Sequence, residues 1–369
     1  MLTYTIRRLV LAVPTLLFIS LVIFLLLELA PGDPMAQVPL TVPPEVKEKM
    51  RLALGLGEPV HIRFWKWLVQ FFWVEPQVLI DSIFGTKLSW NWEVPVPMPT
   101  ADALEALRAE GLVREVAGQV EVLTKEPRII SWQTRSPVMD IVVQRLPQTL
   151  WVVGMAYVVG ILIAIPVGIY SAYRQYSFFD QAGTFVTMIG YSVPPFFTGP
   201  LMIVIFAVYL GWFPSIYDTT HVVNDWASFK KQIWQMFLPM MVLALQITAQ
   251  IARFMRASML DNLNQDYVRT ARAKGLGERT VVLIHVLRNS MIPVVTVIAL
   301  AVPAVFGGSI ITEQVFKVNG IGQLLITAIQ ANDLPMVQTL TFIFAVLIVL
   351  FNLIADVLYG ILDPRIRYD

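Results

Sequence analysis

The segment with the densest side-chain chemistry in this 369-residue chain runs from residue 266 to residue 278. Its sequence, Asp-Tyr-Val-Arg-Thr-Ala-Arg-Ala-Lys-Gly-Leu-Gly-Glu, predicts a short basic helix that stops at Gly275. A second short helix follows, and its apolar residues are Val281, Val282, Ile284, Val286 and Leu287. Anionic lipid headgroups could hold a basic loop of this kind, but they would not require an apolar stripe. Glycine just past a helix end supplies the left-handed turn that lets two short helices pack as an L.

Other kinds of chemistry lack the residues that they need. The chain has no cysteine, so it has no disulfide, thiolate metal site or cysteine nucleophile. Its three histidines, at positions 61, 221 and 285, are far apart in the sequence and support neither a metal cluster nor a catalytic triad. The phosphate-binding pattern G-x-x-x-x-G-K-[ST] does not occur. We expect a chain that is not an enzyme, binds no cofactor and cannot split ATP itself.

The composition indicates a membrane protein. Hydrophobic residues make up 56% of the chain and charged residues 14%, and the mean hydropathy is +0.66. A soluble domain has about 25% charged residues, so the composition excludes an ordinary soluble enzyme and also intrinsic disorder. The net charge is only +1, which gives no reason to expect a nucleic acid as partner.

Uncharged runs long enough to cross a bilayer position the basic segment. A membrane helix needs about 20 apolar residues, and six such runs occur, at roughly 9–30, 148–171, 182–210, 235–252, 289–312 and 338–360. The apolar stretch of the first run is too long for a signal peptide, and no cleavage pattern follows it. The sequence thus predicts an all-α membrane protein with six spans.

The distribution of Lys and Arg predicts how the spans are oriented. The termini and the short loops on their side carry twelve of these residues, whereas the short loops near 212–234 and 313–337 carry three. By the positive-inside rule, both termini and the loop 253–288 face the cytoplasm. The long segment 31–145 then lies outside. We expect three parts: a first span (1–30), this extracytoplasmic segment, and a five-span core (146–369).

The extracytoplasmic segment contains two notable stretches. The first is aromatic, and it consists of Phe64, Trp65, Trp67, Phe71, Phe72 and Trp73. These rings suit the lipid headgroup layer, although packing against neighbouring helices explains them equally well. The second is an insert at about 90–131, which reads as a helix over 100–110 and a hairpin of 112–116 with 120–123. It is too small to hold a large core of its own, so we expect it to pack on something else.

The spans offer little for ion coupling. Proton- or ion-coupled transporters place ionisable residues inside the membrane, and here Glu28, Asp180 and Asp356 lie only near the ends of their apolar runs. Capping or exposure at the interface explains these carboxylates better than a proton relay. An ion-coupled secondary transporter and a membrane-anchored interaction protein remain the alternative functions.

Ordered motifs give the chain a resemblance to a known family. The stretch 266–276, D-Y-V-R-T-A-R-A-K-G-L, resembles the coupling motif of the dipeptide/oligopeptide-type permease subunits of bacterial ATP-binding-cassette importers. R-T-A stands where the wider motif has E-A-A, a departure typical of the peptide branch. Further similar motifs are A-P-G-D-P at 30–34, R-L-P-Q-T-L at 145–150, S-V-P-P-F at 192–196, E-Q-V-F at 313–316 with G-I-G at 320–322, and L-D-P-R at 362–365. Asn319 replaces the family's usual proline.

The resemblance implies a half-channel in the bacterial cytoplasmic (inner) membrane that imports peptides, nickel complexes or sugars. The expected partners are a second permease, two ATP-binding subunits that use ATP and Mg, a periplasmic or lipid-anchored substrate-binding protein, and membrane lipid. By the same resemblance, a loop within 253–288 contacts the ATPases. The residues expected in that contact are Asp266, Tyr267, Arg269, Thr270, Ala271, Ala273, Lys274, Gly275, Leu276 and Gly277.

Overall fold

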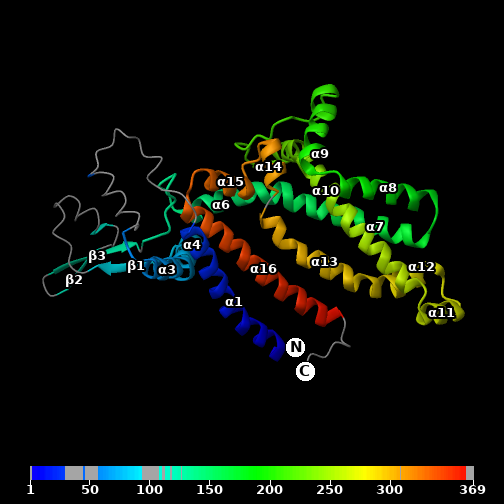
Figure 1. The fold of residues 1–369 in the computed structure, drawn as a ribbon, viewed down its shortest axis with the longest axis horizontal. Helices are drawn as coiled ribbons and strands as arrows, with labels where there is room; N and C mark the ends of the chain where they lie inside the picture. The colour runs from blue at the N-terminus through cyan, green and yellow to red at the C-terminus, as the bar shows by residue number, and fades with distance from the viewer. Residues whose placement is uncertain are drawn as a thin grey trace. The chain divides into compact units, whose positions relative to one another are not determined.

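The computed structural model describes residues 2–29, 57–93, 113–116, 119–125, 127–307 and 309–362, together with positions 45 and 108–109. The chain falls into two compact units. Unit 1 contains residues 1–23, 142–330 and 340–369, and unit 2 contains residues 24–141 and 331–339. The described residues are nearly all helical (Figure 1).

Unit 1 is built from long helices with short connections. Its elements, some of which extend into unit 2, are α1 (Leu2–Glu28), α6 (Val138–Thr149), the π-helical turn η2 (Leu150–Gly154), α7 (Met155–Tyr173), α8 (Phe178–Ser192), α9 (Pro195–Met202), η3 (Ile203–Tyr209), α10 (Trp226–Leu263), α11 (Asp266–Ala273), α12 (Glu278–Thr280), η4 (Val281–Val286), α13 (Leu287–Gly307), α14 (Ile310–Phe316), α15 (Ile321–Gln330) and α16 (Leu334–Leu362).

Five described helices are long and apolar enough to cross a membrane: Ile6–Glu28, Val138–Tyr173, Trp226–Leu263, Glu278–Pro303 and Leu334–Val357. The third expected span, at 182–210, is not one straight helix. It consists of Phe178–Ser192 and Pro195–Tyr209, which meet at 107°. The bend follows from Pro194 and Pro195, because proline disfavours helical geometry in the residue before it, and Val193 is extended at φ −86° and ψ 120°.

Small residues bring α7 and α10 unusually close together. Every fourth residue of α7 is small and buried, and these residues are Ala156, Gly160, Ala164, Gly168 and Ala172. A Cβ added at Gly168 would lie 2.6 Å from the Met255 Cβ, and one at Gly160 would lie 2.7 Å from an Ile247 methyl carbon. Such a stripe lets two backbones approach in a membrane, where van der Waals contact drives helix association. Figure 1 shows the two helices side by side.

A buried carboxylate fixes α15 to the start of the core. The Glu313 side chain is fully buried and accepts hydrogen bonds from the Gln323 N–H at 2.8 Å and the Thr149 hydroxyl at 3.1 Å. The Thr149 Oγ1 in turn accepts the Ile321 N–H at 2.8 Å. Two N–H groups at the start of α15, which have no partner within the helix, are therefore satisfied. A Cβ at Gly320 would lie 2.5 Å from the Thr149 Oγ1, so this position requires glycine.

Unit 2 combines a long helix with a small sheet. Its elements are α3 (Val60–Val69), η1 (Gln70–Val74), α4 (Glu75–Phe84), β1 (Trp90–Glu93), β2 (Val113–Val116) and β3 (Gln119–Lys125), and the strand order is β1-β3-β2. The Arg128 guanidinium binds the buried Glu75 at 2.7 Å and Asp140 at 2.9 Å. The Asp333 carboxylate accepts the Trp132 N–H at 3.0 Å and the Ser131 hydroxyl. These contacts anchor the chain on both sides of the insert.

The structure confirms the expected hairpin, in which Val116 pairs with Gln119 and Val113 with Val122. The sequence did not predict β1, which pairs antiparallel with β3. Most of the helix expected over 100–110 lies outside the described residues.

A first prediction tests the close packing of α7 on α10. Gly168→Ala should destabilise the purified protein by about 1–3 kcal/mol, because the added methyl meets backbone and Cβ atoms of α10. Gly183→Ala on α8 is the matched control, since a Cβ there meets nothing nearer than 3.5 Å. Thermal unfolding in detergent measures both variants. Equal unfolding temperatures for the two would contradict the proposed packing.

A second prediction concerns Glu313, whose pKa is raised to about 7 by burial. A raised pKa means that stability from the neutral acid is present below about pH 4.5 and is lost as the pH rises to about 7. Glu313→Gln mimics the neutral acid and does not titrate. Relative to the wild type, the variant should gain up to about 3 kcal/mol between pH 4.5 and pH 8. Thermal unfolding across this range tests the idea, and parallel curves for the two proteins would refute it.

Candidate coupling loop

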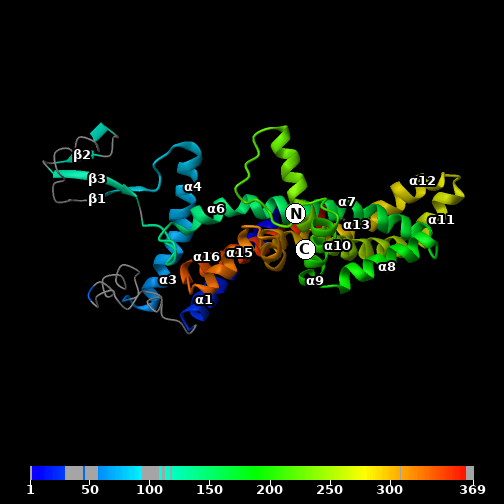
Figure 2. The same ribbon diagram turned by 90° about the horizontal axis from the view of Figure 1, so that it is seen from above.

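Helix α10 carries the basic segment beyond the apolar core. Its 38 residues span about 57 Å at 1.5 Å per residue, whereas the hydrocarbon layer is about 30 Å thick. The helix ends at Leu263, and α11 begins at Asp266 after a connection of two residues, Asn264 and Gln265. Figures 1 and 2 show α11 and α12 together at one end of the bundle formed by α7, α10 and α13.

An apolar side anchors α11 to that bundle. Val268 and Ala271 are the buried residues of this helix, and they belong to one cluster with Met255 and Met259 of α10. Val281, Val282 and Val286 of η4 join the same cluster. The second helix therefore presents an apolar stripe, as predicted, although Ile284 is 58% exposed. Ala271 is buried and packs α11 against this cluster.

The turn after α11 depends on one glycine. Gly275 has φ +79°, and its N–H donates to the Arg272 carbonyl at 2.9 Å. The prediction of a left-handed glycine at this position is confirmed. Gly277 is different, because its φ of −63° and ψ of 144° suit any residue, and it precedes the first turn of α12. Only Gly275 is therefore required by backbone geometry.

An ion pair that the sequence interpretation missed closes the turn. The Arg272 guanidinium binds the Glu278 carboxylate through two contacts, at 2.7 Å and 3.1 Å. This bidentate geometry fixes orientation as well as distance. The pair links α11 directly to α12 across the turn. A spacing of six residues around two glycines was the only signal in the sequence that could have revealed it.

The remaining predicted residues form the outward side of the loop. Arg269 is 75% exposed on its side chain, and Ala273, Lys274 and Leu276 are exposed as well. Asp266 and Tyr267 lie at the start of α11, where the Tyr267 hydroxyl donates to the Asn262 side-chain oxygen at 2.9 Å. The Thr270 hydroxyl donates to the Asp266 carbonyl at 2.9 Å.

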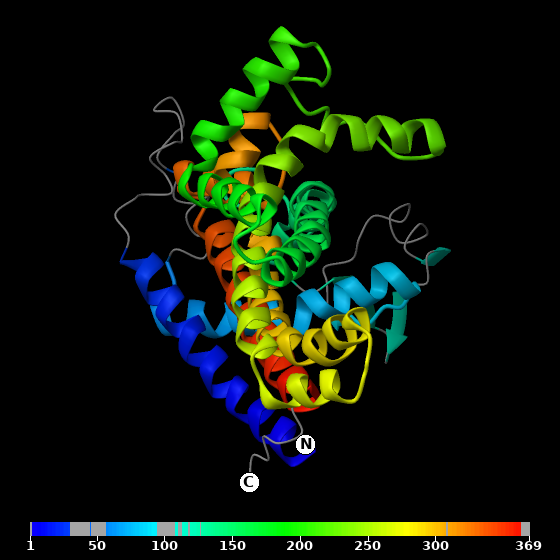
Figure 3. The same cartoon turned by 90° about the vertical axis from the view of Figure 1, so that its right-hand side faces the viewer.

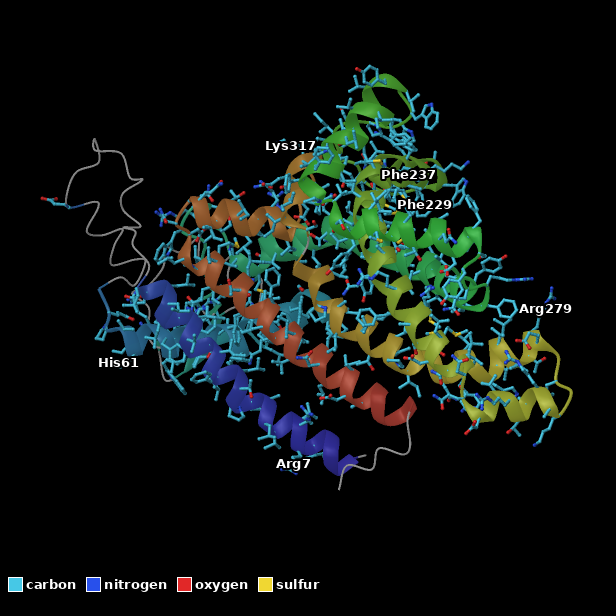
Figure 4. The ribbon with its side chains drawn as sticks, turned by 45° about the vertical axis from the view of Figure 1, so that its right-hand side comes forward. Arg7, His61, Phe229, Phe237, Arg279 and Lys317 are labelled. Atoms are coloured by element: carbon cyan, nitrogen blue, oxygen red, sulfur yellow. The ribbon has the colours of Figure 1, made fainter. Side chains whose placement is uncertain are left out.

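The loop lies at one end of α13. Figure 4 shows Arg279 at this end, far from Lys317 at the other.

The carboxylates near the span ends form ion pairs with arginine, which the sequence analysis did not predict. Asp180 is buried and binds Arg256 through two contacts, at 2.7 Å and 2.9 Å. Asp356 binds Arg8 at 3.1 Å, and Glu28 binds Arg63. Within the described part of the chain, no three His, Asp or Glu side chains gather where they could hold a metal ion.

Comparison with known proteins gives the family. Residues 164–368 match the family "Binding-protein-dependent transport system inner membrane component", and residues 1–81 match its N-terminal counterpart. The oligopeptide transport system permease protein AppB of Bacillus subtilis is 34% identical over the full length of both chains. The glutathione transport system permease protein GsiC of Escherichia coli K12 is 32% identical, also over full length.

Among solved structures, an amino acid ABC transporter crystallised with histidines aligns with 60% of this chain and 94% of its own, at a TM-score of 0.45 and 12% identity. The family follows from the full-length relatives and from the match over residues 164–368. This chain belongs to the binding-protein-dependent transport system inner membrane components, as a multi-pass permease subunit of the oligopeptide type.

Proposed function

We propose that the chain forms half of a translocation pathway that imports peptides or similar small solutes across the bacterial inner membrane. The relatives support this substrate class, because AppB is named for oligopeptides and GsiC for glutathione, a tripeptide. The other half is a second permease subunit. A periplasmic or lipid-anchored binding protein delivers the solute, and two ATP-binding subunits bind ATP and Mg and supply the energy.

The loop from Asp266 to Gly277 is the contact with an ATP-binding subunit in this proposal. The observation that supports it best is the two-sided construction of α11. One side is fixed to α10 through Val268 and Ala271, and the other side is exposed at Arg269 and Lys274. A force applied to the exposed side therefore reaches α10 and η4 through packed side chains. Closure of the ATPases then shifts the spans between two states.

Both termini and the loop 253–288 face the cytoplasm in this proposal, and residues 31–145 face outward. The support is the Lys and Arg asymmetry of the short loops. The fold agrees with it, because α13 separates the loop from α14, so that Arg279 and Lys317 lie at its opposite ends (Figure 4).

Cysteine labelling tests this orientation in a chain that has no cysteine of its own. Thr134→Cys and Asp261→Cys both replace exposed side chains. In intact spheroplasts an impermeant maleimide should label the Thr134→Cys protein and leave the Asp261→Cys protein unmodified. After permeabilisation both should react, which controls for accessibility. Labelling of the second protein alone in intact cells would reverse the orientation.

Substitution of Gly275 tests the coupling role. Valine at φ +79° should cost about 1–3 kcal/mol of backbone strain and displace the exposed side of α11 from its partner. We expect Gly275→Val to abolish substrate-stimulated ATP hydrolysis and uptake in reconstituted complexes. The six spans should still insert, and the binding protein should still dock, because the turn lies at the end of the bundle.

Gly277→Val is the matched control, since its backbone suits any residue and an added Cβ meets no atom within 4 Å. It should retain most of the transport activity. If Gly275→Val hydrolysed ATP and transported at the unmutated rate, the loop would be an ordinary turn and the coupling proposal would fail.

A further inference from the structure

The helix formed by α3, η1 and α4, from Val60 to Phe84, has apolar residues on two opposite sides. On the inner side, Trp67, Leu68 and Val74 are buried at 5%, 8% and 2% exposure. Phe64 and Phe71 stack on either side of Trp67, with ring centroids 6.4 Å and 5.6 Å away. Half of the aromatic stretch noted in the sequence is therefore protein core.

The other half is exposed, and two of its rings, Trp65 and Trp73, belong to a longer apolar stripe. We define the outer stripe as Ile62, Trp65, Val69, Trp73, Ile80 and Ile83, which are all exposed. Their spacings of three, four or seven residues place them on one side of a helix. A large apolar surface of this kind marks an interaction site. Charged residues flank it only sparsely, as with Lys66, so the whole length of the helix has an apolar outer face.

The end of α1, which belongs to the same unit, fixes this helix at the boundary of the membrane. The Phe24 ring packs edge-on against Phe64 at 5.2 Å, and the Glu28 carboxylate binds the Arg63 guanidinium. Helix α1 crosses the membrane over Ile6–Glu28, so Glu28 marks the depth at which the hydrocarbon ends. The α3 residues that touch it lie at the same depth. Leu25 and Leu26 beside them are exposed too, so a lipid-facing surface begins at this point.

We propose that the helix from Val60 to Phe84 lies in the plane of the headgroup layer, with its outer stripe in contact with membrane lipid. Tryptophan, present here as Trp65 and Trp73, favours this layer because its ring combines an apolar surface with a polar N–H group. The paired Arg63 and Glu28 remain among the headgroups, as does Lys66, which forms an ion pair with Glu58. In the orientation proposed above, this layer is that of the outer leaflet.

This proposal goes beyond the transport function and does not depend on the substrate or on the coupling loop. Lipid contact gives the extracytoplasmic segment a second attachment to the bilayer besides the spans. A helix held at both ends in the headgroup layer restricts how far the segment tilts while the spans move. A helix that projected from the membrane would instead carry its C-terminal residues away from lipid.

Spin labels on single cysteines test the placement in the complete transporter complex, in vesicles of phosphatidylethanolamine and phosphatidylglycerol. Trp65→Cys and Ile83→Cys lie near the two ends of the stripe, and Ser82→Cys is the matched control. Ser82 is exposed like its neighbour Ile83 but points away from the stripe. Oxygen concentrates in lipid and a polar nickel chelate in water, so their collision rates with each label report its surroundings.

We expect the ratio of oxygen to nickel collisions to be several-fold higher for the labels at 65 and 83 than for the label at 82. High ratios at both stripe positions support a helix in the membrane plane. A high ratio at 65 with a low one at 83 would show a projecting helix and overturn the proposal. Exclusion of both reagents from the stripe would show that a protein covers it, which overturns the proposal as well.

Discussion

The close approach of α7 and α10 is the constraint on which the rest of unit 1 depends. A side chain larger than hydrogen at Gly168 would occupy the space of the Met255 Cβ, so the sequence permits this approach only because small residues recur every fourth position. Helix α10 then packs against α7, α8 and α13 along one axis (Figures 1 and 3). The α10–α13 contact adds a polar clasp, in which the Ser258 and Ser290 hydroxyls each donate to the other's carbonyl.

The packing around α10 also connects α11 to the α7–α10 contact. Met255 of α10 lies beside Gly168 of α7. With Met259, it belongs to the cluster that also contains Val268 and Ala271 of α11. Movement of α11 therefore acts on side chains that already support the α7–α10 contact. A well-packed interior responds to such a push by shifting whole elements, because it has little free volume to absorb it. The Arg272–Glu278 pair links α11 to α12 across the turn.

The sequence predicts the parts of this arrangement that depend on local signals. It does not predict contacts between residues that are far apart in the chain. Apolar runs predicted the spans, and the glycine stop predicted the turn at Gly275, because both signals are local. The break at Pro194 and Pro195 is a local effect too, but its angle of 107° is not encoded locally. The Glu313–Thr149 contact joins residues separated by 164 positions, and no periodicity encodes such a pair. Strand β1 is short and has no turn signal linking it to β3, so pairing with a distant hairpin decides its structure.

Three carboxylates near the ends of the apolar stretches are paired with arginines. Asp180 and Asp356, in unit 1, each bind an arginine at the end of an apolar stretch. Glu28, in unit 2, does the same with Arg63. Each of these pairs joins the end of an apolar stretch to a neighbouring helix. These groups are therefore suited to fixing helix ends. The exposed side of α11, which packs onto α10 through Val268 and Ala271, is the surface on which the proposed ATPase contact would act.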